Sequence, residues 1–147
     1  MSGFEFCETM VGSYHLLSSP DDERPISFTI RVRSRPWLRF LRRPEAEIEG
    51  EVDAEGFADH RVLRGTLGLD VLRTRKLRYS FEFAGNDGTH YAFVGEKVLE
   101  LTRLAATIST LPGRIQAASG AEVGRALLRF DFQTQLLPFL RSFRPST

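Results

Sequence analysis

Residues 76–98 read Lys-Leu-Arg-Tyr-Ser-Phe-Glu-Phe-Ala-Gly-Asn-Asp-Gly-Thr-His-Tyr-Ala-Phe-Val-Gly-Glu-Lys-Val. In the first part of this stretch, apolar residues alternate with polar ones, the apolar set being Leu77, Tyr79, Phe81 and Phe83. Period-two alternation is typical of a β-strand with one buried face. Gly85-Asn86-Asp87-Gly88 holds residues that tolerate positive φ, which predicts a tight turn. Tyr91 to Val98 is then the return strand of an antiparallel hairpin.

The same alternation continues on both sides of this hairpin. It is clear over residues 4–16, 28–35, 45–55 and 63–71, and weaker at 102–111, 114–118 and 123–130. Pro112-Gly113 is expected to end the strand before it, because Pro lacks the N–H that a ladder needs. About eight to ten strands with one apolar face each favour an all-β fold, an antiparallel β-barrel of the calycin or lipocalin type, since closure removes exposed edges.

Two segments depart from the strand pattern. Residues 36–44, between Pro36 and Pro44, are expected to form an exposed loop that carries Trp37. Asp131–Phe143 has apolar residues at helical spacing and predicts a C-terminal helix, which Pro138 would kink. No linker or repeat interrupts the chain, so residues 1–147 are expected to form one barrel domain.

Composition excludes several classes of protein. The chain has 147 residues, 41% of them hydrophobic and 27% charged, with 20 Lys+Arg against 19 Asp+Glu. It is too apolar to be disordered and has no apolar run long enough for a membrane span. We expect no signal peptide, because no apolar segment follows a cationic start. One cysteine excludes an internal disulfide framework and favours a cytoplasmic location.

The charges are arranged in blocks. Arg24–Arg43 holds seven Arg and no acid, and Glu45–Glu55 holds six acids and no base. On the strand in each block, residues 31–35 and 45–55, the charges share one parity, so paired strands would place an Arg ladder beside a Glu ladder on the solvent side. The alternative is a patch for nucleic acid or an acidic membrane, in which Trp37 accompanies the cations. We favour the ladders and expect no nucleic-acid partner, because the chain as a whole is not basic.

Two charged residues break the alternation in an informative way. Glu8 and Lys97 both fall on the apolar parity of their strands and so would point into the barrel. An unpaired buried charge is costly, so each needs a partner, either the other or the hydroxyls of Tyr14 and Tyr79. The structural interpretation is a buried pair that fixes register, and the functional one is a polar anchor in a ligand cavity.

Other chemistry is missing from the sequence. The three histidines, His15, His60 and His90, show no metal-ligand spacing, and no Gly-rich nucleotide loop is present. We therefore expect no metal and no cofactor.

Several short motifs resemble those of a known family. Phe6-Cys7-Glu8-Thr9-Met10-Val11-Gly12 resembles the Phe-Thr-Glu-x-Met-x-Gly opening of a small β-rich module. That module accompanies bacterial glucose–methanol–choline oxidoreductases, the cholesterol-oxidase-like flavoproteins. Further similar stretches are Asp87-Gly88 with Tyr91, Gly95 and Lys97, then Thr110-Leu111, and Asp131-Phe132 with Gln135-Leu136. Cys7 departs from the usual Thr. The resemblance implies an accessory module with a partner flavoenzyme and sterol-like or lipid-like substrates, and it carries over no catalytic residue.

Three functional hypotheses follow. The first is a non-catalytic barrel that binds an apolar small molecule, or assists an oxidoreductase acting on one. Its expected ligand-binding residues are Glu8, Tyr14, Tyr79, Phe81, Phe93 and Lys97. The second is an interaction or homo-oligomerisation module that uses Trp37 and Phe40. The third is a small acid/base enzyme that uses Glu8 together with a Tyr or a His, although no residue pattern in the chain requires it.

Overall fold

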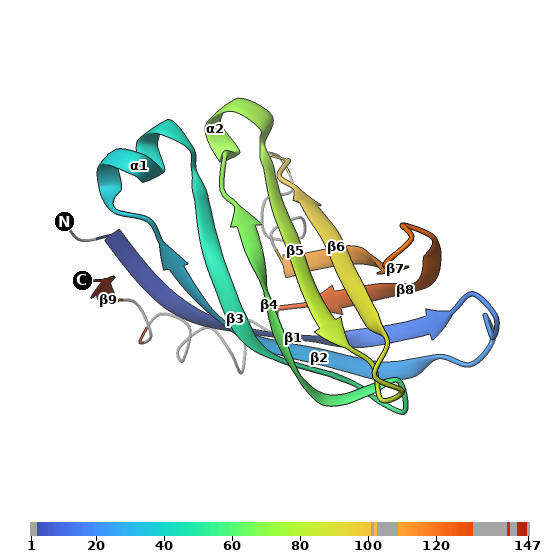
Figure 1. Ribbon diagram of the computed structural model, residues 1–147. Helices are drawn as coiled ribbons and strands as arrows, with labels where there is room; N and C mark the ends of the chain where they lie inside the picture. Colours follow the sequence, from blue (N-terminus) through green and yellow to red (C-terminus); the bar gives the residue numbers. More distant parts are fainter. Residues whose placement is uncertain (1–2, 101, 103–108, 131–140, 142–143, 147) are drawn as a thin grey trace.

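The structure, a computed structural model, describes residues 3–100, 102, 109–130, 141 and 144–146. Its strands are β1 (Gly3–Leu16), β2 (Arg24–Ser34), β3 (Glu45–Ala54), β4 (Ala58–Gly68), β5 (Lys76–Ala84), β6 (His90–Val98), β7 (Thr110–Ala117), β8 (Glu122–Arg129) and β9 (Arg144–Ser146). Two short helices, α1 (Trp37–Arg42) and α2 (Val71–Thr74), lie between strands (Figure 1).

The described strands form one antiparallel sheet that closes on itself. Strands β2 to β8 pair in chain order, and β1 pairs with both β8 and β2, which completes an eight-stranded barrel. The short β9 pairs with the first residues of β1. The all-β class and the antiparallel barrel predicted from the sequence are confirmed.

The hairpin of residues 76–98 forms as predicted and sets the pattern for the rest. Phe81 and Phe93 face each other across β5 and β6 and are both buried. The turn has Gly88 at φ 83°, and the Gly85 N–H donates to the Thr89 carbonyl at 2.8 Å. Outward-facing residues of the same strands, such as Arg78 and Glu82, are exposed. Alternation therefore divides each strand between the core and the solvent.

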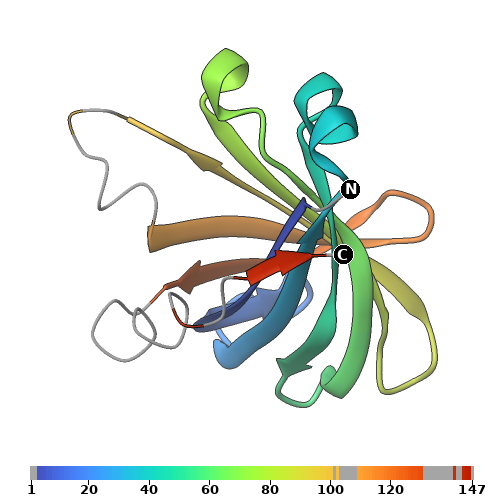
Figure 2. The same ribbon diagram turned by 90° about the vertical axis from the view of Figure 1, so that its left-hand side faces the viewer.

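The two ends of the barrel differ in their connections. The turns β1–β2, β3–β4, β5–β6 and β7–β8 lie at one end, called here the hairpin end. The β2–β3 and β4–β5 connections contain α1 and α2 and lie at the opposite end, called here the helical end. Figures 1 and 2 both show α1 and α2 beside one another at this end.

Aromatic side chains close the hairpin end and fill the middle of the barrel. At the hairpin end Phe57 packs on Tyr91, with ring centres 4.7 Å apart, and the Tyr14 hydroxyl donates to the Glu55 carbonyl. In the middle Phe28, Phe81 and Phe93 form one cluster with ring centres 4.9–6.0 Å apart.

Two local expectations are corrected. Residues 37–42 form α1 instead of an irregular loop, because the Pro36 carbonyl accepts from the Arg39 and Phe40 N–H groups and the Phe40 ring packs edge-on against Phe4. Strand β7 also runs through Pro112. Its ladder with β6 extends only as far as Gly113, so the N–H that Pro112 lacks costs no bond to β6. The predicted helix over Asp131–Phe143 lies outside the described residues, apart from residue 141.

Candidate functional site

A hydrogen bond crosses the interior of the barrel between strands that are not neighbours. The Tyr79 hydroxyl on β5 donates to Glu8 Oε1 on β1 at 2.6 Å. Both residues are buried, with 1% of Tyr79 and 8% of Glu8 exposed. Parity placed Glu8 inside, and the tertiary structure selected Tyr79 from the partners considered. This bond gives one oxygen of the buried Glu8 carboxyl group a hydrogen-bond partner.

Lys97 on β6 completes a buried polar cluster. Its side chain is 3% exposed, and Nζ lies 5.1 Å from the centre of the Tyr79 ring, within range of a cation–π interaction. Among the described residues, Lys97 Nζ has neither a carboxylate within ion-pair distance nor an oxygen within hydrogen-bond distance. The ammonium therefore retains hydrogen-bond donors that the described part of the barrel does not use.

Burial sets the protonation states within this cluster. It lowers the pKa of Lys97, and the nearby charge of Glu8 partly opposes that effect. It also raises the pKa of Tyr79 well above 10, with a further contribution from Glu8. Tyr79 thus stays protonated and acts as the donor in its bond to Glu8.

The Lys97 ammonium belongs to the helical end of the barrel. Lys97 pairs with Leu77 in the β5–β6 ladder, and the next residue, Val98, is already 51% exposed. Phe4, Leu69 and Leu77 are partly buried at this end and pack against the core. The cluster is therefore a polar group set among apolar side chains, the composition typical of a small-molecule site.

The remaining residues expected at the site lie elsewhere in the barrel. Tyr14 is at the hairpin end and donates to the Glu55 carbonyl, remote from Lys97 in the fold. Phe81 and Phe93 stack on one another in the middle. Of the two residues expected at an interaction surface, Trp37 begins α1, and Phe40 is half-buried against Phe4.

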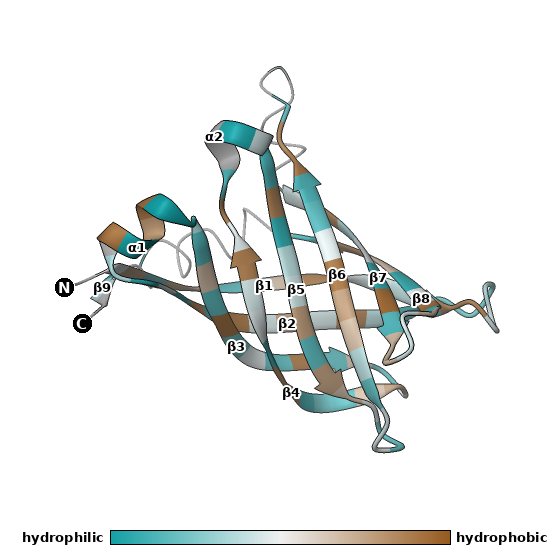
Figure 3. Cartoon of the chain, turned by 45° about the horizontal axis from the view of Figure 1, so that its top comes forward, coloured by the Kyte–Doolittle hydropathy of each residue, from teal (hydrophilic) through white to brown (hydrophobic). Residues whose placement is uncertain are grey.

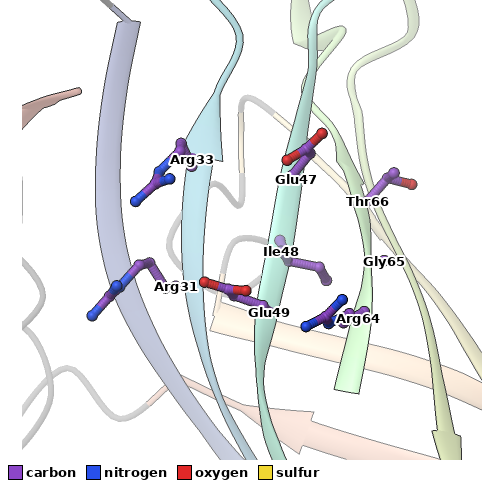
Figure 4. A pocket seen from close by; sticks show the side chains of 8 residues that line it. All are labelled: Arg31, Arg33, Glu47, Ile48, Glu49, Arg64, Gly65 and Thr66. Carbon is purple, nitrogen blue, oxygen red and sulfur yellow. The ribbon is translucent and has the colours of Figure 1, made fainter. Parts of the chain in front are cut away.

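The outer wall carries the predicted charge ladders. Arg31 lies opposite Glu49 and Arg33 opposite Glu47 in the β2–β3 register, as expected. The ion pair that forms, however, joins Arg33 Nε to Glu5 Oε2 of β1 at 3.3 Å. Figure 4 shows the side chains of Arg31 and Arg33 directed toward β1 and away from β3.

Beside the ladders runs a shallow groove. Its volume is about 350 Å³, and Glu47, Glu49, Arg64 and Thr66 are among its lining residues. Side chains of both charge signs line this groove on the open outer wall, as is usual for the solvent-facing side of a sheet.

Residues at the helical end were missed by sequence reasoning. These are the exposed cations Arg73 and Arg75 near α2, which join Arg39 and Arg42 of α1 at the same end. The sequence did contain a pattern that indicates them. Residues 37–43 and 71–76 both mix apolar residues with cations, and each segment follows a strand.

The described residues contain no group of three or more His, Cys, Asp or Glu side chains that could hold a metal ion. His60 has two carboxylate neighbours, Glu51 at 2.8 Å and Asp53 at 3.7 Å, but all three are on the exposed surface of β3 and β4. Among the described helices, none is long and apolar enough to cross a membrane.

These features define the class of the protein as a closed antiparallel β-barrel with a polar cluster in its interior. No protein-family model matches the chain, and no curated protein matches it. Among solved structures it is similar to a de novo designed fluorescence-activating β-barrel. The identity is 14%, the match covers 84% of this chain and 92% of that one, and the TM-score is 0.46. So distant a likeness carries no functional argument, and the resemblance to the oxidoreductase-associated module stays a prediction.

Proposed function

We propose that this barrel binds a small, mainly apolar molecule, lipid-like or sterol-like, whose oxygen atom accepts a hydrogen bond from Lys97. The observation that carries the proposal is the Lys97 side chain, which is 3% exposed and whose Nζ is not fully sealed from solvent yet has no acceptor among the described residues. Removing an ammonium from water is costly unless a partner replaces the lost hydration. A ligand carboxylate, carbonyl or hydroxyl would supply that partner.

The organisation of the barrel supports entry from the helical end. Phe57 and Tyr91 close the hairpin end, and the cluster of Phe28, Phe81 and Phe93 occupies the middle. Lys97 stands one residue from the end of β6 on the helical side. An apolar ligand would place its oxygen near Lys97 and its hydrocarbon part among Phe4, Leu69 and Leu77.

In this proposal Lys97 contacts the ligand, and Glu8 and Tyr79 orient the Lys97 ammonium. The Tyr79 ring lies beneath Nζ, and the Glu8 charge favours the protonated form of Lys97. A protonated Lys97 is the better donor to a ligand oxygen.

Native mass spectrometry and calorimetric titration with oleate and with cholesterol test the proposal. We expect the wild-type protein to bind at least one of the two probes. Lys97→Met should weaken that binding about tenfold or more, the loss of a charged hydrogen bond. The matched control is Lys76→Met, since Lys76 is the other lysine of the chain and is exposed beside Glu96.

The stability of the empty protein distinguishes a ligand anchor from a structural ion pair. Lys97→Met should leave the free energy of unfolding equal or higher, because it removes a buried charge that lacks a close partner. Glu8→Gln is a second variant, since its amide oxygen can still accept from Tyr79, and it should fold while binding the probe more weakly. Failure of both probes to bind the wild-type protein, or unchanged binding by Lys97→Met, would overturn the proposal.

A further inference from the structure

We propose that the helical end of the barrel docks on an anionic lipid surface, with α1 inserting its exposed leucines among the lipids and arginines of both helical connections contacting phosphate groups. This inference concerns an outer surface and is independent of whether the interior holds a ligand.

The apolar part of this surface is the outer face of α1. Leu38 is 64% exposed and Leu41 is 74% exposed, and their spacing of three residues places them on one helical face. The other face of α1 is anchored, since the Phe40 ring packs against Phe4 with ring centres 5.4 Å apart. Figure 3 shows the hydrophobic segment of α1 projecting beyond the sheet. Two exposed leucines on an anchored helix are available to a lipid surface without unfolding any part of the barrel.

Four cations lie at the same end of the barrel as these leucines. Arg39 and Arg42 belong to α1, Arg73 to α2, and Arg75 follows α2 directly, and all four side chains are exposed. Among the described residues none of the four has a carboxylate within ion-pair distance. Neighbouring cations at the same end are paired, Arg43 with Glu45 at 3.2 Å and Lys76 with Glu96 at 3.7 Å. With no ion-pair partner among the described residues, these four exposed guanidinium groups are free to meet an external anion.

The two helical connections act as one surface because they lie side by side. They follow β2 and β4, which flank β3 in the sheet, and both project beyond its edge (Figures 1 and 2). Basic side chains near a membrane surface are attracted to anionic lipid, and inserted apolar side chains add to this attraction.

The same cations could meet nucleic acid, but the apolar residues favour lipid. Binding of single strands relies on exposed aromatic rings for base stacking. Among the α1 side chains that the structure describes, the Phe40 ring is half-buried on Phe4 and the exposed apolar ones are Leu38 and Leu41, which insert into lipid but do not stack on bases.

Vesicle flotation tests the inference. We expect the protein to float with phosphatidylcholine vesicles that contain about 30% phosphatidylserine, and not with pure phosphatidylcholine vesicles. Raising the salt from about 0.1 M to about 0.5 M should reduce binding severalfold, because screening shortens the reach of the arginine charges.

Two variants and a matched control separate the contributions. The rim variant changes the four cations to Gln at Arg39, Arg42, Arg73 and Arg75. The leucine variant combines Leu38→Ser and Leu41→Ser. The wall control removes the same number of exposed arginines from the barrel wall, at Arg31, Arg64, Arg114 and Arg129. Because every changed side chain is exposed, all three proteins should melt within a few degrees of the wild type.

The rim variant should lose about tenfold or more of its vesicle binding, the leucine variant should lose a comparable part, and the wall control should retain most of it. Equal loss in the rim variant and the wall control would overturn the inference, because binding would then follow net charge alone. So would absence of binding to anionic vesicles, or tighter binding to single-stranded DNA than to vesicles at the same salt. Lys97→Met should bind vesicles normally, so failure of the ligand proposal would not affect this result.

Discussion

At the scale of the residue, the pKa values of Tyr79 and His60 are both raised, but for different physical reasons. The pKa of Tyr79 is raised first by burial, which removes the water that would stabilise the phenolate. The pKa of His60 is raised first by its hydrogen bond to Glu51 and then by the charge of Asp53, with no contribution from burial in that direction. A surface pair of this kind is sensitive to salt, and the buried one is not.

We predict that Glu51→Gln returns the pKa of His60 toward 6.5 and that Asp53→Asn lowers it less, since the hydrogen bond is the larger cause. Because the folded-state pKa is the higher one, the contribution of His60 to stability is complete below pH 6.5 and is lost as the pH rises through the folded-state value. A proton NMR titration of the His60 ring in the three proteins measures this. Identical titration curves would contradict the prediction.

At the scale of the element, β4 shows how a glycine shapes the barrel wall. Gly65 pairs with Ile48 of β3 and Phe81 of β5, and a Cβ at this position would collide with the backbone of Ser80 and Phe81. The backbone of β5 thus approaches β4 as closely as a residue without a side chain allows. Gly68, three residues further along the same strand, has ordinary space, with the nearest atom 3.7 Å from a built Cβ.

We expect Gly65→Ala to destabilise the protein by about 1–3 kcal/mol, because the β5 backbone must move to admit the methyl group. Gly68→Ala is the matched control in the same strand, and it should be neutral or stabilise by up to about 1 kcal/mol through the entropy of the unfolded chain. Urea denaturation of both variants provides the measurement. Equal free energies of unfolding for the two variants would contradict the prediction, because the β5 backbone would then move without destabilising the protein.

At the scale of the whole molecule, closure depends on one pair of strands that are distant in sequence. Seven of the strand pairs join consecutive strands, from β1–β2 to β7–β8, whereas the β1–β8 ladder joins Gly12 to Leu128. Bringing β1 and β8 together costs more loop entropy than forming a hairpin, so that ladder should form late in folding.

Leu128→Ala should therefore accelerate unfolding and change the folding rate little, while it lowers the free energy of unfolding by about 2–5 kcal/mol. Leu63→Ala is the comparison, because Leu63 is equally buried but lies on β4 between two consecutive partners. It should slow folding as well. Stopped-flow kinetics with Trp37, the one tryptophan of the chain, report both rates. A folding rate reduced equally in both variants would place closure before the transition state.

The sequence by itself determined the all-β class, the buried faces of the strands and the inward direction of two charges. Alternation sufficed because side chains in a strand point to opposite faces in strict turn, so Glu8 and Lys97 were marked by their parity alone. It also determined the turn over residues 85–88, where Gly88 has a positive φ, because tolerance of positive φ is a local property of the residue.

Only the tertiary structure decided which of these residues meet. Tyr79 rather than Tyr14 donates to Glu8, because closure of the barrel brings Tyr79 of β5 across the interior to Glu8, whereas Tyr14 lies further along β1 at the hairpin end. The same holds for Arg33, whose ion pair is with Glu5 rather than with the Glu47 opposite, and for α1, which depends on the contact of Phe40 with Phe4. Each of these outcomes requires contacts between segments distant in the chain, which no local pattern of residues contains.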